Sequence, residues 1–383
     1  MKIPPLISQG EQLTIAEARR YSRHVVIPEF ATIGQERLKN AKVVCVGAGG
    51  LGSPILMYLA AAGVGTIGII EFDTVEETNL ARQIIHGQSD LGLSKAVSAQ
   101  SKMREINPLI EVVIHEVRLD NSNVMEIFAL YDVVIDGSDN FATRYLVNDA
   151  CVLLKKPCVW GSIYRFDGQA SIFWSDYGPC YRCMHPVPAS DLPNCAEAGV
   201  LGVLCATIGS IQATETIKLI TGVGTPLIGS MIIYDALESK FTTIEILKDP
   251  QCRICSVNPI QTELLNEYEA VCGPATSDEI NVVELKRTID SGKDFMLIDV
   301  RESHEFETGH IPGSISFPLG NFADTNFVTT LPRNKPIILL CRSGKRSATS
   351  LDLLKAAGFD NAFNVRGGVI AWAQQIDSTC EVY

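Results

Sequence analysis

Apolar residues in the first two thirds of the chain gather in short strand-like runs, each followed by a stretch with helical spacing. The run AKVVCV at 41–46 leads through a glycine-rich turn into a helix-compatible stretch at 53–62. Further strands are predicted at 66–72 and 132–135, and the second of these leads into the sequence DGSD at 136–139. Strands that alternate with helices indicate a parallel, doubly wound α/β sheet.

The same alternation returns near the C-terminus. The runs FMLIDV at 295–300 and KPIILL at 335–340 have the pattern of buried strands, and residues 347–357 suit a helix. We therefore expect a second, smaller α/β domain.

The region between these two patterns is typical of a connector. No motif occurs between about 258 and 277, where Cys-Gly-Pro at 272–274 indicates a turn. With 383 residues, the chain also exceeds what one hydrophobic core usually organises. We expect a first domain over 1–265, a linker over 266–276 and a second domain over 277–383.

Composition narrows the class of protein. Hydrophobic residues make up 46% of the chain and charged residues 20%, which is an ordinary balance for ordered structure. A net charge of −12 argues against nucleic acid or an anionic membrane as the main partner, because phosphates require basic surfaces. The N-terminus lacks the apolar core of a signal peptide, and the longest uncharged stretch, 198–214, is short for a membrane span. These features predict a cytoplasmic protein.

A glycine-rich turn carries the first chemical signal. Gly47-Ala48-Gly49-Gly50-Leu51-Gly52 lies between a predicted strand and a predicted helix, where small residues let backbone amides approach a phosphate. Glu71 follows about twenty residues later and is suited to accept hydrogen bonds from ribose hydroxyls. These two features alone favour an NAD-dependent dehydrogenase.

Charged residues further along the chain favour a triphosphate instead. The run Thr78-Asn79-Leu80-Ala81-Arg82-Gln83 and then Lys95 supply cations, and Asp139 offers a carboxylate for Mg²⁺. Hydride transfer needs no such set, whereas stabilising a leaving pyrophosphate does. The competing interpretation is that Arg82 and Lys95 are solvated surface charges.

At this point the sequence resembles the MoeB/ThiF-type activating enzymes, which are related to ubiquitin activators, over about residues 10–258. The resemblance rests on Arg20-Tyr21-Ser22-Arg23, the glycine loop, Glu71-Phe72-Asp73, Asn79 to Gln83, Lys95 and Asp139-Asn140. It implies that ATP and Mg²⁺ are bound by Gly49, Gly50, Glu71, Thr78, Asn79, Leu80, Ala81, Arg82, Lys95, Asp139 and Asn140. It also implies a homodimer in which Arg23 reaches the phosphates of the other subunit, so that Arg23, Arg82 and Asp139 are catalytic. Glu71 replaces the aspartate that is more usual in the family, which keeps the charge and changes its distance to the ribose.

Four of the twelve cysteines have the spacing of a metal site. Cys180-x-x-Cys183 and Cys252-x-x-Cys255 each place two thiolates where they can share one tetrahedral ion. A single such pair is equally compatible with redox chemistry. Two pairs predict zinc, and four thiolates leave no open position for catalysis, so we assign the zinc a structural role.

Cys195 stands apart, in a loop-like segment ahead of a helix-compatible run that begins at Val200. One interpretation is a buried structural thiol. The family resemblance implies another, in which Cys195 accepts the activated acyl group or resolves a mixed disulfide.

The sequence Cys341-Arg342-Ser343-Gly344-Lys345-Arg346 follows a predicted buried strand and precedes a predicted helix. Backbone amides in such a turn can surround the sulfur as an anion-binding nest, and three cations flank it. We expect this loop to stabilise a persulfide on Cys341. A cysteine-dependent phosphatase is the main competitor, but this loop has four residues between cysteine and arginine, one fewer than dual-specificity phosphatases have.

The surroundings of this loop resemble a rhodanese domain over about 277–383. The resemblance adds Leu297-Ile298-Asp299-Val300-Arg301-Glu302 and Gly309-His310-Ile311-Pro312-Gly313-Ser314. We interpret Asp299, Arg301 and His310 as structural.

Together these features predict an adenylyltransferase and sulfurtransferase. ATP would activate the C-terminal Gly-Gly carboxylate of a ubiquitin-like sulfur-carrier protein, and a persulfide on Cys341, charged by a cysteine desulfurase, would convert it to a thiocarboxylate. One alternative is a rhodanese-based sulfur relay or scaffold with a regulatory nucleotide site. An NAD-dependent oxidoreductase is another.

Overall fold

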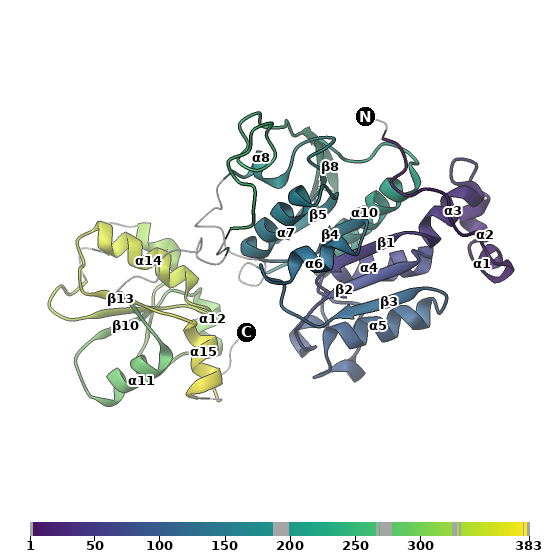
Figure 1. Cartoon of the computed structure of the whole chain (residues 1–383). Helices are drawn as coiled ribbons and strands as arrows, with labels where there is room; N and C mark the ends of the chain where they lie inside the picture. Colours follow the sequence, from purple (N-terminus) through teal and green to yellow (C-terminus); the bar gives the residue numbers. More distant parts are fainter. Residues whose placement is uncertain are drawn as a thin grey trace. The chain divides into compact units, whose positions relative to one another are not determined.

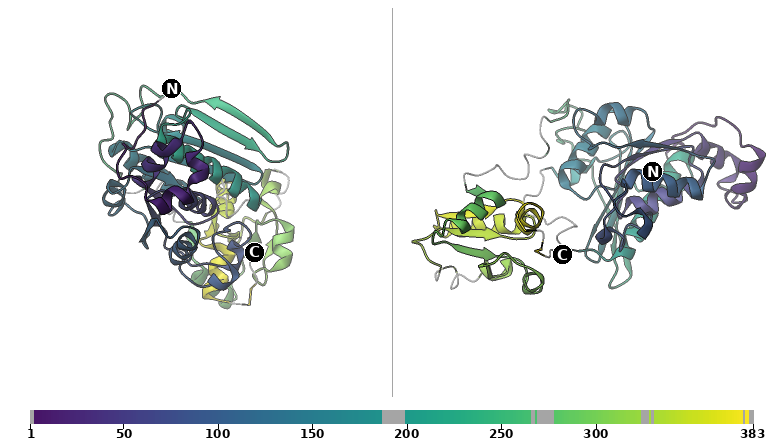
Figure 2. Two further views of the ribbon diagram at one scale, coloured as in Figure 1. Left: turned by 90° about the vertical axis from the view of Figure 1, so that its right-hand side faces the viewer. Right: turned by 90° about the horizontal axis from the view of Figure 1, so that it is seen from below.

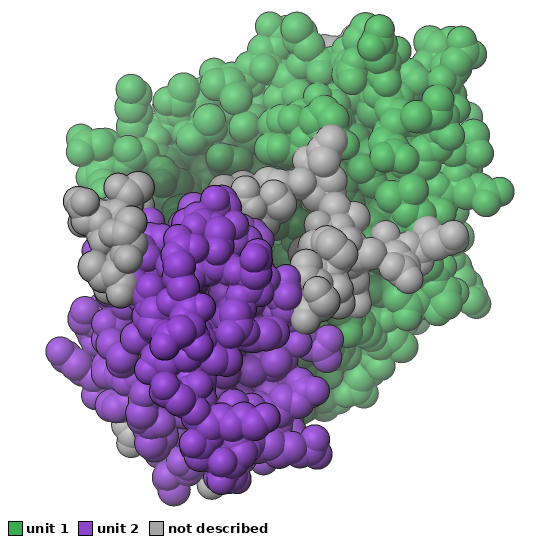
Figure 3. Space-filling model, turned by 90° about the vertical axis from the view of Figure 1, so that its left-hand side faces the viewer, with its two compact units in different colours: residues 1–188, 194–271 green, residues 189–193, 272–383 purple. Residues whose placement is uncertain are grey.

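A computed structural model describes residues 3–186, 199–265, 268, 278–323, 328, 331–377 and 379–380. Contacts divide the chain into unit 1, residues 1–188 with 194–271, and unit 2, residues 189–193 with 272–383 (Figure 3). Both units are α/β structures (Figure 1). The predicted fold class is therefore confirmed.

Unit 1 is built on an eight-stranded sheet with the order β3-β2-β1-β4-β5-β6-β7-β8. The first five strands in this order are parallel, and β5 to β8 pair in antiparallel fashion. The strands are β1 (Lys42–Val46), β2 (Thr66–Ile70), β3 (Glu111–His115), β4 (Val133–Asp136), β5 (Cys158–Tyr164), β6 (Asp167–Phe173), β7 (Ser230–Asp235) and β8 (Lys240–Glu245). β7 and β8 form the hairpin that ends the sheet (Figure 2).

Alternation along β1 explains the two layers of helices around this sheet. Val43 and Cys45 belong to a core cluster with α3, α4, α5 and α10, whereas Val44 and Val46 belong to a second cluster with α6 and α7. Successive strand residues point to opposite faces, so a nearly continuous apolar run requires cover on both sides. The helices are α1 (Ile15–Arg20), α2 (Ser22–Val25), α3 (Ala31–Lys39), α4 (Gly52–Ala62), α5 (Lys95–Ile106), α6 (Val124–Ala129), α7 (Phe141–Leu153), α8 (Tyr181–Met184) and α10 (Gly202–Thr221), with 3-10 turns η1 (Glu77–Asn79) and η2 (Gln88–Asp90).

The order of the strands reverses next to β1. Val46, the last residue of β1, pairs with Ile70 of β2 on one side and with Asp136 of β4 on the other. The chain passes from β1 to β2 and β3 in one direction and then returns to β4, which leaves a crevice at the carboxyl ends of β1 and β4. Both the glycine loop and the DGSD sequence lie at this switch point.

Unit 2 has a five-stranded parallel sheet with the order β11-β10-β12-β13-β9. Ile337 and Leu339 of β12 pack in a cluster with α14, and Ile338 and Leu340 pack in a cluster with α11 and α15. The elements are β9 (Glu279–Ile280), α11 (Val282–Asp290), β10 (Met296–Asp299), α12 (Ser303–Thr308), β11 (Ile315–Ser316), η4 (Leu319–Ala323), β12 (Ile337–Leu340), α14 (Lys345–Ala356), β13 (Ala362–Val365) and α15 (Gly368–Gln375). Cys341 thus follows the central strand directly.

Among the described residues, α10 alone is long and apolar enough to cross a membrane by length and composition. Just over half, 56%, of its most apolar window is buried inside unit 1. It packs against α4 and against strands β5 and β6.

Candidate functional site

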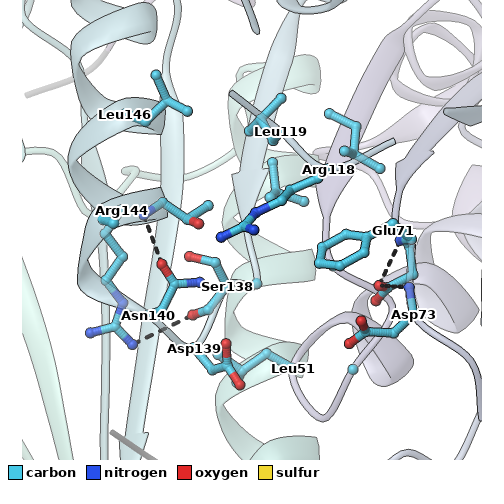
Figure 4. Close-up of a pocket in the computed structure, with 18 of the residues that line it drawn as sticks. Leu51, Glu71, Asp73, Arg118, Leu119, Ser138, Asp139, Asn140, Arg144 and Leu146 are labelled. Carbon is cyan, nitrogen blue, oxygen red and sulfur yellow. Dashed lines mark hydrogen bonds between the residues drawn. The ribbon is translucent and has the colours of Figure 1, made fainter. Parts of the chain in front are cut away.

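A cavity of about 880 Å³ lies at the switch point of unit 1 (Figure 4). The glycine loop, the end of β2, the loop after β3 and the start of α7 form its walls. The described residues that line it are 46, 47, 49–51, 70–73, 82, 83, 95, 117–122, 137–140, 142–144, 146, 163, 200 and 268. Its volume is in the range of sites for small molecules and cofactors.

The glycine loop owes its path to backbone contacts that a side chain would block. Gly47 has φ of 92°, and a Cβ on Gly52 would lie 2.1 Å from the Gly47 carbonyl oxygen. His86 supports the loop from behind, since its Nε2 lies 3.0 Å from the Ala48 carbonyl oxygen and its Nδ1 lies 2.8 Å from Ser98 Oγ. Burial lowers the pKa of His86. Gly49 and Gly50, which we expect to bind ATP, line the cavity.

Glu71 lies just beyond β2, whose predicted end at residue 72 is two residues too late. The strand ends there because the Glu71 carboxylate turns back onto its own chain and accepts hydrogen bonds from Phe72 N at 2.9 Å and Asp73 N at 3.0 Å. Its other oxygen accepts a hydrogen bond from Ala48 N at 3.0 Å. Glu71 therefore joins the glycine loop to the end of β2 and lines the cavity (Figure 4).

The predicted cations Arg82 and Lys95 both line the cavity. Lys95 is only 6% exposed and forms an ion pair of 3.2 Å with Asp73, while Arg82 donates a hydrogen bond of 3.0 Å to the Thr78 carbonyl. Gln83 of the predicted run also lines it, whereas Thr78, Asn79, Leu80 and Ala81 are not among the described residues that do. The Asn79 side chain instead accepts a hydrogen bond from Glu76 N and so caps η1.

The loop after β4 presents Asp139 and Asn140, which are both exposed, at the cavity wall (Figure 4). Asn140 caps α7 by accepting a hydrogen bond of 2.8 Å from Thr143 N. Asp136 fixes the loop from below, since one of its oxygens accepts hydrogen bonds from Ser138 N at 2.9 Å and Ser138 Oγ at 2.6 Å. Burial raises the pKa of Asp136, against the opposing charge of Arg144 and these hydrogen bonds.

Two arginines in the cavity wall were missed by the sequence analysis. Arg144, on the first turns of α7, is 6% exposed, and its guanidinium lies 5.4 Å from the Phe141 ring centroid and 5.7 Å from that of Trp160. Arg118 lies in the loop after β3 (Figure 4). Arg144 is five residues after Asp139, in the helix that follows that loop, so its position could have suggested it. Nothing local distinguishes Arg118.

Arg23 lies away from this cavity. It is an exposed residue of the short helix α2 and is not among the described residues of the cavity wall.

The four predicted metal ligands come together. Sγ atoms lie 3.9 Å apart in Cys180 and Cys183, 3.6 Å apart in Cys180 and Cys252, and 3.4 Å apart in Cys183 and Cys255. All four lie within 4.8 Å of one another, and none is in a disulfide. Four thiolates at about 2.3 Å from one zinc ion would be about 3.8 Å apart, so the cluster fits such an ion. The other predicted cysteine of unit 1, Cys195, lies outside the described residues.

In unit 2, the loop after β12 forms a cradle around the sulfur of Cys341. Gly344 N donates a hydrogen bond of 3.2 Å to Cys341 Sγ, and Ser347 Oγ donates one of 3.3 Å. Behind the loop, a Cβ on Gly368 would lie 2.2 Å from the Cys341 carbonyl oxygen. Ser347 and this close glycine contact were both missed, because they come from α14 and α15 and not from the loop itself.

Two of the three cations beside Cys341 differ in their surroundings. Arg346 forms a bidentate ion pair with Glu305 of α12, at 2.6 and 2.7 Å, so part of its charge is directed away from the sulfur. Burial acts to raise the pKa of Glu305, but Arg346 and the Glu302 amide hold that pKa below its usual range. Lys345 is exposed, and the contacts of the sulfur that we describe are to neutral donors.

The structural interpretation of Asp299 and Arg301 agrees with the structure. Both are almost fully buried and paired at 2.7 Å, and Arg301 also donates a hydrogen bond to the Gly309 carbonyl. His310 stacks on Phe306 with ring centroids 4.0 Å apart.

Two family models match parts of the chain that correspond to the two units. Residues 21–254 match the ThiF family, and residues 281–375 match the rhodanese-like domain.

Relatives with curated descriptions cover nearly the whole chain. A Mycobacterium tuberculosis protein described as "Probable adenylyltransferase/sulfurtransferase MoeZ" is 48% identical over 100% of this chain and 99% of its own length. The "Adenylyltransferase and sulfurtransferase MOCS3" of Drosophila ananassae is 40% identical over 97% of this chain and 87% of its own.

Solved structures support the fold. The structure of E. coli MccB with ATP has a TM-score of 0.55 and 23% identity, and it covers 62% of this chain and 74% of its own. PaaA has a TM-score of 0.54 and 22% identity, with 63% of this chain and 76% of its own covered.

Proposed function

Because this chain belongs to the ThiF family and carries a rhodanese-like domain, it is an adenylyltransferase and sulfurtransferase, and we propose that its substrate is a ubiquitin-like sulfur-carrier protein ending in Gly-Gly. The observation that supports this proposal best is the conjunction of charges at the switch point of unit 1. Arg82, Lys95 and the exposed Asp139 all line one cavity. A terminal carboxylate could meet a bound nucleotide there.

In the proposed first step, a carboxylate oxygen of the carrier attacks the α-phosphorus of ATP, and pyrophosphate leaves. The glycine loop amides would bind phosphate oxygens, and Arg82 and Lys95 would offset the charge that develops on the leaving group. Asp139 would hold Mg²⁺, which supplies further charge stabilisation to the phosphates. Both oxygens of Glu71 accept hydrogen bonds from backbone amides, which keeps the loop in place. Because a carboxylate oxygen can accept more than one hydrogen bond, we expect Glu71 also to contact the ribose.

In the proposed second step, the terminal sulfur of a persulfide on Cys341 attacks the acyl carbon, and AMP leaves. The product is an acyl disulfide between the carrier and Cys341. A second thiol then attacks the Cys341 sulfur, which releases the carrier thiocarboxylate and leaves an enzyme disulfide that a thiol reductant must reopen. We propose Cys195 or another thiol for this role, and a cysteine desulfurase as the donor that charges Cys341.

We further propose that Cys180, Cys183, Cys252 and Cys255 hold one structural zinc ion. Zinc would join the segment around Cys180 and Cys183 to the segment around Cys252 and Cys255. Four thiolates would leave it no open coordination position. Elemental analysis of freshly purified protein should give one zinc per chain, and Cys252→Ser should lose it and become insoluble or melt earlier.

We also propose a cytoplasmic homodimer in which Arg23 reaches the phosphates bound by the other subunit. Its exposure on α2, away from its own cavity, is compatible with that role. An Arg23→Ala subunit mixed with an Asp139→Ala subunit should recover part of the activity, because each mixed dimer would contain one intact site. If mixed dimers form and recover nothing, Arg23 does not act across the interface.

Pyrophosphate exchange tests the proposed first step directly. Labelled pyrophosphate should enter ATP only when the carrier is present, because adenylation is reversible and requires the acyl acceptor. Binding of NAD in place of ATP, with no exchange, would support an oxidoreductase and overturn the proposal.

A further inference from the structure

The chain does not leave unit 1 where the ThiF family match ends, at residue 254. After Cys255 it continues along unit 1, and we call Gln261 to Leu265 together with Tyr268 the return segment. Gln261 is 6% and Tyr268 7% exposed, and Leu264 and Leu265 pack against the core cluster that includes α6 and α7. The return segment is therefore part of the folded unit, although it includes a residue of the expected linker.

Asp149 of α7 holds the return segment in place. This carboxylate is fully buried and accepts hydrogen bonds from Gln261 Nε2 at 2.7 Å and from the Tyr268 hydroxyl at 2.8 Å. Arg182, inside the first cysteine pair, forms a bidentate ion pair with it at 2.7 and 2.8 Å. A buried charge with this many donors is costly to disturb, so it fixes each partner firmly.

The return segment also contacts the loop after β3, which forms a wall of the proposed ATP cavity. The side-chain amide of Asn121, in the loop after β3, donates a hydrogen bond to the Leu265 carbonyl, and Asn121 lines the cavity. Tyr268 lines the same cavity, as do the loop after β3 and the start of α7. One short stretch of chain thus connects two walls that belong to distant parts of the sequence.

We propose that Tyr268 is a positioning residue for the nucleotide. Its ring forms part of the cavity wall, while its hydroxyl, through Asp149, keeps the return segment between Asn121 and α7. The inference rests on the proposed function, since it takes the cavity to be the ATP site. It adds to that function a residue outside the family match and places it at the start of the connection to unit 2.

The test compares substitutions at Tyr268 with a matched tyrosine. Tyr131 belongs to the same core cluster, is 3% exposed and has its hydroxyl 2.7 Å from His115 Nε2, but it is not among the described residues that line the cavity. Both tyrosines would be changed to Ala and to Phe in the full chain. The readouts are the KM for ATP and kcat in carrier-dependent pyrophosphate exchange, the Kd for ATP by calorimetry, and the melting temperature.

Tyr268→Ala should raise the KM and Kd for ATP about tenfold, the scale of losing one aromatic contact, with kcat nearly unchanged. Tyr268→Phe keeps the ring and should shift both by less than about threefold, but it should lower the melting temperature, because the buried Asp149 carboxylate loses one donor. Tyr131→Ala should lower the melting temperature and leave the KM for ATP as it was.

Two outcomes overturn the inference and one overturns its premise. If Tyr268→Ala lowers only the melting temperature, or if Tyr131→Ala raises the KM as much, Tyr268 is merely a core residue. If the wild-type enzyme exchanges no pyrophosphate and binds no ATP, the proposed function itself fails, which this set of measurements separates from failure of the inference.

Discussion

The cavity of unit 1, which we propose as the ATP site, and the cradle around Cys341 in unit 2 both lie at the turn that follows a central parallel strand. The two sites present different kinds of polar group. The cavity presents charged side chains, including Lys95 and the exposed Asp139. The cradle surrounds Cys341 Sγ with a backbone amide and the Ser347 hydroxyl, while Arg346 is engaged by Glu305. A nucleotide must bind and leave, and its charge changes during reaction, so side chains that can exchange partners are suited to it. Cys341 Sγ itself stays attached to the chain while the terminal sulfur is transferred, so short, fixed dipoles are suited to it.

The largest expected effect is the complete loss of sulfur transfer without a loss of adenylation. Cys341→Ala should abolish thiocarboxylate formation from a desulfurase, because no sulfur remains to attack the adenylate, while pyrophosphate exchange stays near the wild-type rate. Mass spectrometry of the carrier measures the first and isotope exchange the second. Ser350→Ala, which changes a buried residue of unit 2 and leaves every thiol in place, is the control. Normal thiocarboxylate yield from Cys341→Ala would remove the cradle from the reaction.

A reciprocal change should disable the cavity alone. Asp139→Ala should slow pyrophosphate exchange on the order of 10²-fold or more through loss of a Mg²⁺ ligand. Persulfide loading of Cys341 should be unaffected. Asp132 directly precedes β4, at the opposite end of that strand from Asp139, and accepts a hydrogen bond from Lys42 N. Asp132→Ala is therefore a suitable control. Equal exchange rates for the Asp139 and Asp132 variants would contradict the assignment.

A smaller effect tests whether neutral donors suffice in the cradle. Ser347→Ala removes the 3.3 Å hydrogen bond to Cys341 Sγ and should slow persulfide transfer about tenfold, the usual scale for a hydrogen bond to a charged group. Ser350, also buried on α14, bonds to the Arg346 carbonyl instead. Ser350→Ala should therefore transfer sulfur at nearly the wild-type rate. If the two variants are equally slow, helix packing and not the hydrogen bond explains the loss.

The smallest effect concerns the ion pair that occupies Arg346. Glu305→Gln keeps a side chain able to cap the α12 amide of Glu302 but removes the charge, and should lower stability by about 1–3 kcal/mol at pH 7. Because the folded pKa of Glu305 is held low, this stabilisation is present above the unfolded pKa of about 4.3 and is lost as pH falls through the folded value. Melting temperatures of the two proteins should converge in acid. A gap that persists at low pH would mean that charge is not the cause.

The features that could be predicted well from the sequence are those whose residues lie within a short stretch of chain. The glycine loop, the two cysteine pairs and the Cys341 loop all lie where expected, because each needs only a short stretch of chain to form. The strand that precedes Glu71 ends earlier than predicted, since the carboxylate bonds to the next two amides. In the run 78–83, a 3-10 turn directs Arg82 and Gln83 to the cavity and not Asn79. A linear motif does not reveal such a difference in direction.

Several site residues escaped the sequence analysis. Gly368 meets the Cys341 carbonyl only because α15 packs against the same loop. Ser347 is six residues after Cys341, but the expected helix over 347–357 did not indicate that its hydroxyl would point back to the sulfur. Arg118 enters the cavity from the loop after β3. These contacts depend on how helices and loops pack in three dimensions, which the pattern of residues along the chain does not indicate.

The return segment determines where the protein can be divided. A fragment that stops at residue 254, the end of the family match, would retain every predicted ATP ligand. It would keep three of the four predicted zinc ligands but lose the fourth, Cys255. It would also leave the buried Asp149 carboxylate without the donors of Gln261 and Tyr268. Each missing hydrogen bond to a buried charge costs about 1–3 kcal/mol, a large part of the stability of a domain. Autonomous folding of the adenylating half thus requires the chain through Tyr268, and a shorter version should be insoluble or unfolded even though its motifs are intact.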